Sequence, residues 1–459
     1  MVEASFCSAP GKVLLTGGYM ILQRPNAGLV LSLDARFHSV VKSLERTDDR
    51  GTLVIVLSPQ FDSRESYRLI FDSGSYHLDP LNGDHQRNPY TENVIIDCIS
   101  VAHARLGAEH VRTMLKDGLS ITILGDNAFY SQKDQVIARG LPLNRKSLQS
   151  LPPFLPCSTH LSNMKKTGLG SSAALTTSLT AALLHFFRVI RLVHNVAQLS
   201  HCRAQGKVGS GFDVSSAVYG PQRYTRFSPE IIQGILSQEY PTVSQVSKVV
   251  EKAWDSEVTP LRLPPGLHLL MGDVSVGSNT PNMVGKVLEW QKRDSSSHMT
   301  MRRLCVANDE LVWTLEHITK LSEDEDINIY HETLRKCSSV RSEEWVEVTS
   351  NPMGQLLFKL RSNFTEIRRM MRAIGEAAAV DIEPSSQRQL ADDTMTIPGV
   401  LIAGVPGAGG YDAVFALLLD RNAALDVEEL WKSRGVVTLA IEEDSVGVAS
   451  DTAEPQSKL

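Results

Sequence analysis

The pattern of apolar and polar positions predicts two groups of strands separated by helices. Alternating or wholly apolar runs bounded by turn residues predict strands over residues 12–15, 29–33, 37–44, 52–57, 67–71 and 119–124, and again over 267–274, 400–403, 413–418 and 436–441. Helical spacing predicts helices over 91–103, 172–189, 193–203 and 427–433, with mostly helical chain up to about residue 380. Because strands and helices are segregated rather than strictly alternating, we predict the α+β class.

Two features divide the chain. Residues 125–166 contain four prolines and little periodicity, and so long an irregular run is typical of a functional lid or of disordered chain. The turn at Tyr219-Gly220-Pro221 then separates the two groups of strands. We predict an N-terminal domain over residues 1–222, a C-terminal domain over 223–445 and a flexible polar tail over 446–459.

Composition excludes several classes of function. The 459 residues include 46 Lys and Arg against 52 Asp and Glu, and a net charge of −6 argues against a nucleic-acid-binding protein. The most apolar helical run, residues 173–187, is too short and too rich in Ser and Thr for membrane insertion. The six cysteines form no C-x-x-C pair, so neither a disulfide framework nor a zinc site is indicated, and we expect reduced thiols inside the cell.

The sequence ends in Ser457-Lys458-Leu459. A free C-terminal S-K-L tripeptide is read by the peroxisomal import receptor, and the polar segment before it favours an accessible tail. We therefore expect a peroxisomal protein, with a cytoplasmic pool left open. The sequence does not distinguish a monomer from a homodimer.

The strongest chemical signal is the segment Lys165-Lys166-Thr167-Gly168-Leu169-Gly170-Ser171-Ser172-Ala173-Ala174, which opens a predicted helix. Glycines let the backbone approach a ligand closely, and the unpaired amides at a helix N-terminus attract phosphate. The lysines add positive charge, and the serine hydroxyls can bind phosphate or magnesium. A simple Gly/Ser connector does not explain why these groups converge on one helix start, so we predict a phosphate-binding loop.

Two other nucleotide-binding motifs fit this segment poorly. It satisfies the loose G-x-G-x-x-G/A dinucleotide pattern, but the chain before it is polar and the next acidic residue after the motif is Asp213, about twice as far away as a Rossmann fold requires. A Rossmann oxidoreductase is therefore disfavoured. A Walker A motif is absent, because the Gly-Lys pairs beginning at Gly11, Gly206 and Gly285 are each followed by valine.

Three glycine-containing segments together resemble the motifs of the GHMP kinase superfamily, in the same order along the chain. The first is Ser8-Ala9-Pro10-Gly11-Lys12-Val13-Leu14-Leu15-Thr16-Gly17-Gly18-Tyr19, the second is the phosphate-binding loop, and the third is Val405-Pro406-Gly407-Ala408-Gly409-Gly410-Tyr411-Asp412. The resemblance implies the GHMP kinase fold. Its N-terminal α/β domain resembles ribosomal protein S5 and its C-terminal domain is ferredoxin-like.

Within the superfamily, the chain resembles the phosphomevalonate kinases of the longer eukaryotic type. The resemblance is carried by residues 204–214, with the sequence AQGKVGSGFDV, and by residues 277–284, with the sequence GSNTPNMV. It implies transfer of the ATP γ-phosphoryl group to mevalonate 5-phosphate, in isoprenoid synthesis. Another GHMP kinase, such as a mevalonate kinase, and a catalytically silent GHMP-fold binding protein remain as alternatives.

The resemblance also implies roles for particular residues. Lys12 lies where the family places a catalytic lysine, and Asp213 matches an aspartate near the acceptor oxygen. Because the acceptor is a phosphate with a second pKa near ~6, we expect Asp213 to orient Lys12 and the acceptor rather than to remove a proton. The expected ATP-binding residues are Lys166, Gly168, Leu169, Gly170, Ser171, Ser172, Ala173 and Ala174. The expected acceptor-binding residues are Lys12, Tyr19, Lys207, Ser210, Ser278, Thr280, Gly407 and Gly409.

Magnesium is expected as the partner of ATP, with one departure from the related enzymes. Mevalonate kinases carry a magnesium-binding glutamate upstream of the aspartate, but the stretch Ser200-His201-Cys202-Arg203 contains no carboxylate. We therefore expect Ser172, ATP oxygens and water to hold the ion. His194 and His201 share a helix face but lack a third ligand, so they indicate surface or core histidines rather than a metal site.

Overall fold

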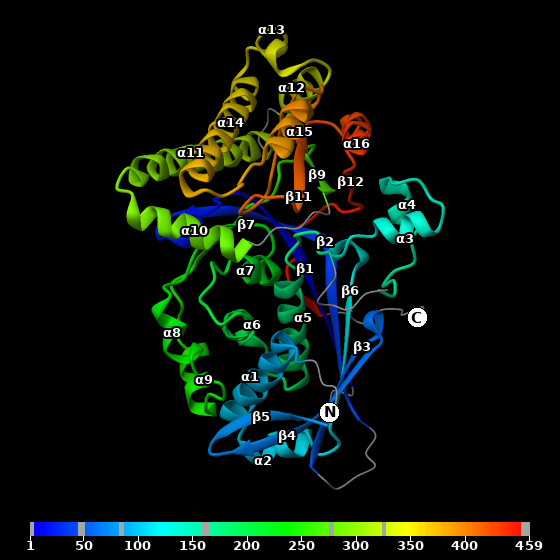
Figure 1. Ribbon diagram of the computed structural model, residues 1–459, viewed down its shortest axis with the longest axis vertical. Helices are drawn as coiled ribbons and strands as arrows, with labels where there is room; N and C mark the ends of the chain where they lie inside the picture. Colours follow the sequence, from blue (N-terminus) through cyan, green and yellow to red (C-terminus); the bar gives the residue numbers. More distant parts are fainter. Residues whose placement is uncertain are drawn as a thin grey trace.

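The computed structural model describes residues 4–44, 51–81, 87–157, 165–274, 280–323 and 327–450. Two of the expectations above, for Ser278 and for the tripeptide at 457–459, lie outside these residues. The described chain forms two layered domains, one above the other in Figure 1. Within the described ranges, no helix has the combination of length and apolarity that crossing a bilayer requires.

The first domain is built on a sheet of ten described strands. Its main path runs β14-β1-β2-β6-β3-β4-β5; β7 and β13 also pair with β2, and β8 pairs with β7. The bounds are β1 Ala4–Thr16, β2 Ala27–Ser43, β3 Thr52–Ser58, β4 Ser63–Asp72, β5 Ser75–Pro80, β6 Leu119–Gly125, β7 Gln222–Thr225, β8 Glu257–Pro260, β13 Glu443–Asp444 and β14 Ala449–Ser450. All pairs are antiparallel except β3 with β6.

The long strand β2 replaces two strands predicted over 29–33 and 37–44. The chain continues through Asp34, which is exposed, and the ladder with β1 includes Leu33 before it and resumes at Arg36. A register shift between Pro10 and Gly11 bends the pair at this point. Such a bulge adds a residue to one strand without ending the pairing, so a local polar interruption does not end the strand.

Helices cover one face of this sheet. They are α1 (Pro89–Leu106), α2 (Ala108–Met114), α5 (Ser171–Phe186), α6 (Val193–Gln205), α7 (Phe212–Tyr219), α8 (Glu230–Leu236) and α9 (Val243–Val250). The helix α5 packs directly on β1 and β2 and is buried over most of its surface. Its small Ala, Ser and Thr side chains let it lie close to the strands, and this places its N-terminus beside β1.

The second domain has a four-stranded antiparallel sheet in the order β10-β11-β9-β12. Its strands are β9 (His268–Asp273), β10 (Val400–Gly404), β11 (Ala413–Leu418) and β12 (Val437–Thr438). Its helices are α10 (Thr280–Arg293), α11 (Ser297–Glu323), α12 (Ile327–Ser338), α13 (Trp345–Val348), α14 (Pro352–Ala378), α15 (Ser385–Met395) and α16 (Ala423–Ser433). The long helices α11 and α14 pack together on this domain (Figure 1).

The irregular stretch predicted over 125–166 contains more structure than the sequence suggested. It holds the short helices α3 (Lys133–Ala138) and α4 (Arg145–Gln149). Val136, Leu151 and Leu155 form a small apolar cluster of their own. These residues show no helical or strand periodicity over a long window, so the pattern alone did not reveal them.

The strands that pair in the first sheet lie on both sides of residue 222, where the sequence predicted the boundary between the domains. The strands β7 and β8 join the first sheet although they lie at and beyond residue 222, and β13 and β14 return to it near the end of the described chain. The expected division at 222 therefore passes through one sheet, and part of the expected tail, residues 449–450, pairs with β1. We propose that the domains divide between β8 and β9.

Candidate active site

The phosphate-binding loop predicted at 165–174 lies against the first motif on β1. The backbone amide of Lys12 donates to the Leu169 carbonyl at 2.9 Å. A Cβ on Gly11 would lie 3.0 Å from that same carbonyl oxygen, so a glycine there permits the close approach of the two backbones. The structure therefore brings together two motifs that lie more than 150 residues apart in the sequence.

Two glycines shape the loop itself. Gly168 and Gly170 both have φ of 78°, a left-handed conformation that side chains disfavour, and Gly170 is the N-cap of α5. A Cβ on Gly170 would lie 2.9 Å from Cε of Lys12. Gly170 therefore allows both the turn into the helix and the passage of the Lys12 side chain across it.

The helix that follows presents its first turn at this junction. Ser171 and Ser172 are half-buried, whereas Ala173 and Ala174 are buried against the core. The first amides of an α-helix have no partner within the helix and carry its positive dipole. This end of α5 is chemically suited to bind a phosphate group.

Lys12 extends from β1 to the loop. Its Nζ donates to the Gly168 carbonyl at 3.1 Å and lies 5.5 Å from the centre of the Phe212 ring. Burial lowers the pKa of the Lys12 ammonium, and the carboxylates of Asp213 and Asp412 act in the opposite direction. Lys12 is thus a half-buried cation placed beside a phosphate-binding helix N-terminus.

A buried histidine links the helix start to Asp213. Nε2 of His201, on α6, lies 3.1 Å from the Ser172 hydroxyl and 3.9 Å from Oδ2 of Asp213. Burial lowers the pKa of His201; nearby Asp213 opposes this shift and Lys207 adds to it. The neutral imidazole therefore joins two of the predicted site residues, Ser172 and Asp213.

The third glycine motif closes the site from the second domain. The amide of Gly407 donates to the Leu14 carbonyl at 3.0 Å, and the Tyr19 hydroxyl donates to the Ala408 carbonyl at 2.8 Å. A Cβ on Gly18 would lie 2.4 Å from the Gly407 carbonyl oxygen, so glycine at position 18 lets the two loops touch. All three motifs thus meet at one junction between the domains.

Four other predicted residues have contacts or positions of their own in the structure. Lys207 is exposed just after α6 and acts electrostatically on His201. The Ser210 carbonyl accepts a hydrogen bond from the Tyr224 hydroxyl at 3.2 Å, close to Asp213 in the chain. Lys166 bridges to Tyr130 through the backbone, and Thr280 is exposed at the first residue of α10.

Comparison with known proteins agrees with this arrangement. The family described as "GHMP kinases N terminal domain" matches residues 155–221, which contain the phosphate loop and Asp213. The chain is 40% identical to the peroxisomal phosphomevalonate kinase of Arabidopsis thaliana, over 99% of this chain and 97% of that one. It is 33% identical to a phosphomevalonate kinase of Aspergillus fumigatus, over 93% and 90% of the two chains. The chain belongs to the phosphomevalonate kinase family.

The fold of this phosphomevalonate kinase family member is also found in solved structures. A structure of the Streptococcus pneumoniae phosphomevalonate kinase, determined with phosphomevalonate and AMPPNP, has a TM-score of 0.58 and 16% identity to this chain. It covers 97% of this chain, and 99% of the solved chain is matched. The likeness confirms the GHMP kinase fold predicted from the three motifs.

Sequence reasoning missed three residues of the site in this phosphomevalonate kinase. His201 is buried, as one of the two predicted alternatives had it, but its contact with Ser172 was not foreseen. Tyr90, in the first turn of α1, has its ring 5.5 Å from that of His201, and the side chains of Gln205 and Ser172 act on its hydroxyl. Asp412 was visible only as the last residue of the third motif. A lone histidine or tyrosine carries no sequence signal of its own, so only packing reveals these contacts.

One basic residue close in sequence to the predicted site has a structural role. Arg203 is buried and pairs with Asp97 of α1, which also accepts a hydrogen bond from Ser200 at 2.8 Å. Nη2 of Arg203 donates to the Glu239 carbonyl at 3.0 Å. Arg203 therefore ties α6 to α1 and is not placed to hold a substrate.

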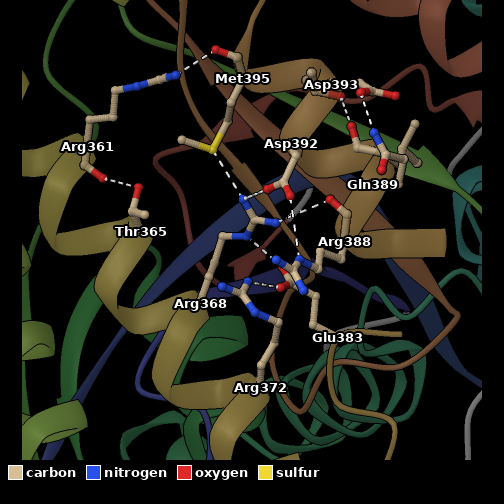
Figure 2. Close-up of polar contacts among 12 residues, drawn as sticks. Arg361, Thr365, Arg368, Arg372, Glu383, Arg388, Gln389, Asp392, Asp393 and Met395 are labelled. Carbon is tan, nitrogen blue, oxygen red and sulfur yellow. Dashed lines mark hydrogen bonds and ion pairs between the residues drawn. The ribbon is translucent and has the colours of Figure 1, made fainter. Parts of the chain in front are cut away.

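A second ion cluster supports the third motif from behind. The Glu383 carboxylate accepts from Nε of Arg368 at 2.6 Å and pairs with Arg372, and Arg368 also pairs with Asp392 at 2.8 Å (Figure 2). Residue 382, next to Glu383, accepts a hydrogen bond from the Gly410 amide at 2.8 Å. The cluster therefore anchors the segment on which the glycine loop rests.

Proposed function

We propose that this protein transfers the γ-phosphoryl group of ATP to mevalonate 5-phosphate, forming 5-diphosphomevalonate and ADP. The observation that carries the proposal is the 40% identity to the Arabidopsis phosphomevalonate kinase along nearly the whole of both chains. The convergence of all three glycine motifs on Lys12 supports the same reaction.

Charge at the site suits a reaction between two anions. The transferring phosphoryl group must approach an acceptor that is itself negative, so positive charge and fixed donors stabilise the transition state. The N-terminus of α5, with residues 168–174 and Lys166, is proposed to bind the ATP phosphates. Lys12, beside that helix, is proposed to neutralise charge on the phosphoryl group in transit.

Asp213 is proposed to orient rather than to abstract a proton. A phosphate monoester with a second pKa near ~6 is already largely deprotonated at pH 7, so no strong base is required. Asp213 lies in the first turn of α7 and acts electrostatically on Lys12. From this position Asp213 can orient both Lys12 and the acceptor phosphate.

The acceptor is proposed to bind between the first and third motifs. Tyr19 and Gly407 take part in the loop contact described above, and Gly409 bonds within the same loop to the Pro406 carbonyl. Lys207 and Ser210 both lie shortly before Asp213 in the chain. Thr280, the first residue of α10, is proposed as a further acceptor contact, and Ser278, which lies outside the described residues, is proposed as another.

Magnesium is proposed to accompany ATP. Hydroxyl and carboxylate oxygens are ligands suited to Mg²⁺, and Ser172 offers one at the helix start. Among the residues that the structure describes, no group of three or more His, Cys, Asp or Glu could hold a metal ion. The remaining ligands are therefore proposed to be ATP oxygens and water, and bound magnesium would supply charge neutralisation between the phosphates.

We also infer a peroxisomal location. The Arabidopsis relative is named as peroxisomal, and Ser457-Lys458-Leu459 matches the import address. The address works only at a free carboxyl terminus. An N-terminal fluorescent fusion lacking residues 457–459 should lose punctate localisation and its contact with the import receptor; unchanged puncta would contradict this assignment.

A substrate panel tests the reaction. ADP release should be measured with mevalonate 5-phosphate, with mevalonate and without acceptor. We expect turnover with the phosphorylated acceptor. Activity only on mevalonate would establish the alternative mevalonate kinase, and ATP binding without any turnover would favour a silent GHMP-fold binding protein.

A further inference from the structure

The third glycine motif ends in a carboxylate that faces the phosphate loop. A Cβ on Gly168 would lie 3.6 Å from Cβ of Asp412, so the Asp412 side chain packs against this glycine. The carbonyl of the same Gly168 accepts the hydrogen bond from Nζ of Lys12 at 3.1 Å. Asp412 and Lys12 therefore approach one loop residue from different domains.

The backbone holds Asp412 firmly in this place. Its carbonyl accepts from the Val274 amide at 3.1 Å, and the next residue, Ala413, pairs with Asp273 at the start of β11. Behind the loop, Gly410 is bonded to residue 382, and Glu383 is held by the arginine cluster of Figure 2. The position of Asp412 thus depends on the packing of the second domain.

Carboxylates from both domains act electrostatically on Lys12. Asp213 acts on it from α7 of the first domain and Asp412 acts on it from the second. In the part of the chain that the structure describes, the uncharged groups in contact with the Lys12 ammonium are the Gly168 carbonyl and the Phe212 ring, and Ser32 is the ladder partner of Lys12 on β2. Burial lowers the pKa of Lys12, and the two carboxylates favour its charged form.

We propose that Asp412 is a positioning residue, which acts from the second domain to hold the Lys12 ammonium toward the phosphate loop. The proposal rests on the role of Lys12 in the proposed function. A long lysine side chain with one hydrogen bond to a carbonyl has many accessible rotamers, and a second carboxylate on a rigid loop reduces them. Asp412 would also make the active form of Lys12 depend on correct closure of the two domains.

The test compares Asp412→Asn with the parent enzyme. We expect kcat/KM for mevalonate 5-phosphate to fall about tenfold, because a positioning group acts through Lys12 without contacting the reacting atoms. The alkaline limb of the profile of kcat/KM against pH should shift to lower pH by about one unit, because removal of a neighbouring carboxylate lowers the pKa of an ammonium group. Asp412→Glu, which keeps the charge, should keep the limb near its original place.

A second measurement does not need turnover. Lysines labelled by reductive ¹³C-methylation can be titrated by NMR, and the Lys12 signal is the one missing in Lys12→Arg. Its midpoint should fall in Asp412→Asn, and an unchanged midpoint in folded protein would overturn the proposal. This outcome is separate from failure of the proposed function, which would appear as no turnover of mevalonate 5-phosphate by the parent.

Glu383→Gln is the matched control. It removes a buried charge that supports the same loop but lies behind it. We expect a lower melting temperature and a Lys12 midpoint that falls less than in Asp412→Asn, because the Asp412 carboxylate is retained. If this variant shifts the midpoint as much as Asp412→Asn does, the effect belongs to loop stability and the proposal is wrong.

Discussion

The Ser172 hydroxyl and the His201 imidazole meet at 3.1 Å, between the start of α5 and the middle of α6. The two residues lie on different helices, and their contact places a buried imidazole beside the hydroxyl that is expected to bind magnesium. Asp213 lies 3.9 Å from the same Nε2. His201 therefore connects the predicted phosphate loop to the residue expected to orient Lys12.

His201 should make stability depend on pH. Burial lowers the pKa of His201 in the folded protein, so the unfolded chain binds a proton more readily below the ordinary pKa of histidine, about 6.5. Folding stability contributed by this group is then present above about pH 6.5 and is lost as the pH falls through the folded pKa. Denaturant unfolding at pH 5, 6 and 7 measures the free energy of unfolding. This free energy should rise less with pH in His201→Gln than in the parent.

The contrast with His194 controls that experiment. This histidine is also buried on α6, and burial lowers its pKa too, but it packs on Tyr219 and Trp254 away from Ser172. His194→Gln should flatten the pH dependence of stability and leave the KM for ATP unchanged, whereas His201→Gln should also raise that KM. An equal KM for ATP in His194→Gln and His201→Gln would contradict a role for His201 at the site.

Replacement of Lys12 should abolish most activity. Lys12→Met removes the cation beside the phosphate-binding helix, and loss of a group that stabilises transition-state charge costs about 10²–10³ in kcat. The melting temperature should change little because Lys12 is only half-buried. Lys432→Met, at an exposed lysine near the end of α16, is the control and should keep full activity.

Asp213→Asn should lower kcat by about tenfold, because orientation is weakened but no base is lost. Asp426 is a matched control, since it also lies in the first turn of a helix, α16, and its replacement by Asn tests the helix-dipole effect alone. Complete loss of turnover in a folded Asp213→Asn variant that still binds both substrates would instead identify Asp213 as a required base.

Gly170→Ala should impair both folding and catalysis. Alanine at φ 78° costs about 1 kcal/mol, and its Cβ would meet Lys12 at 2.9 Å and displace it. Gly140 has a similar φ of 65°, and a Cβ there would have no neighbour within 4 Å among the described residues, so Gly140→Ala carries the backbone cost alone. Denaturant unfolding should give similar losses of stability, and only Gly170→Ala should lower kcat; a fully active Gly170→Ala would contradict the packing against Lys12.

Local features of the fold were predictable from the sequence. The strand over 119–124, the helix over 172–189 and the strands over 400–403 and 413–418 are close to β6, α5, β10 and β11. Each has a clear apolar period and is bounded by turn residues. The pattern missed α7 and α15, which carry mixed polar faces, and it missed the return of β13 and β14, because two-residue strands have no period to detect.

The candidate site also has features that the sequence predicts and features that only the tertiary structure shows. The glycine loops, the helix start and the order of the three motifs are local properties of the chain, since φ and backbone approach depend on which residue stands at each position. The sequence by itself therefore determined the glycine loop at the start of α5, the prediction that it binds phosphate, and the family. The contacts of His201 with Ser172, of Arg203 with Asp97 and of Asp412 with Gly168 were decided only by tertiary structure. They join residues far apart in the chain, and sheet register and helix packing, rather than spacing, determine which of them meet.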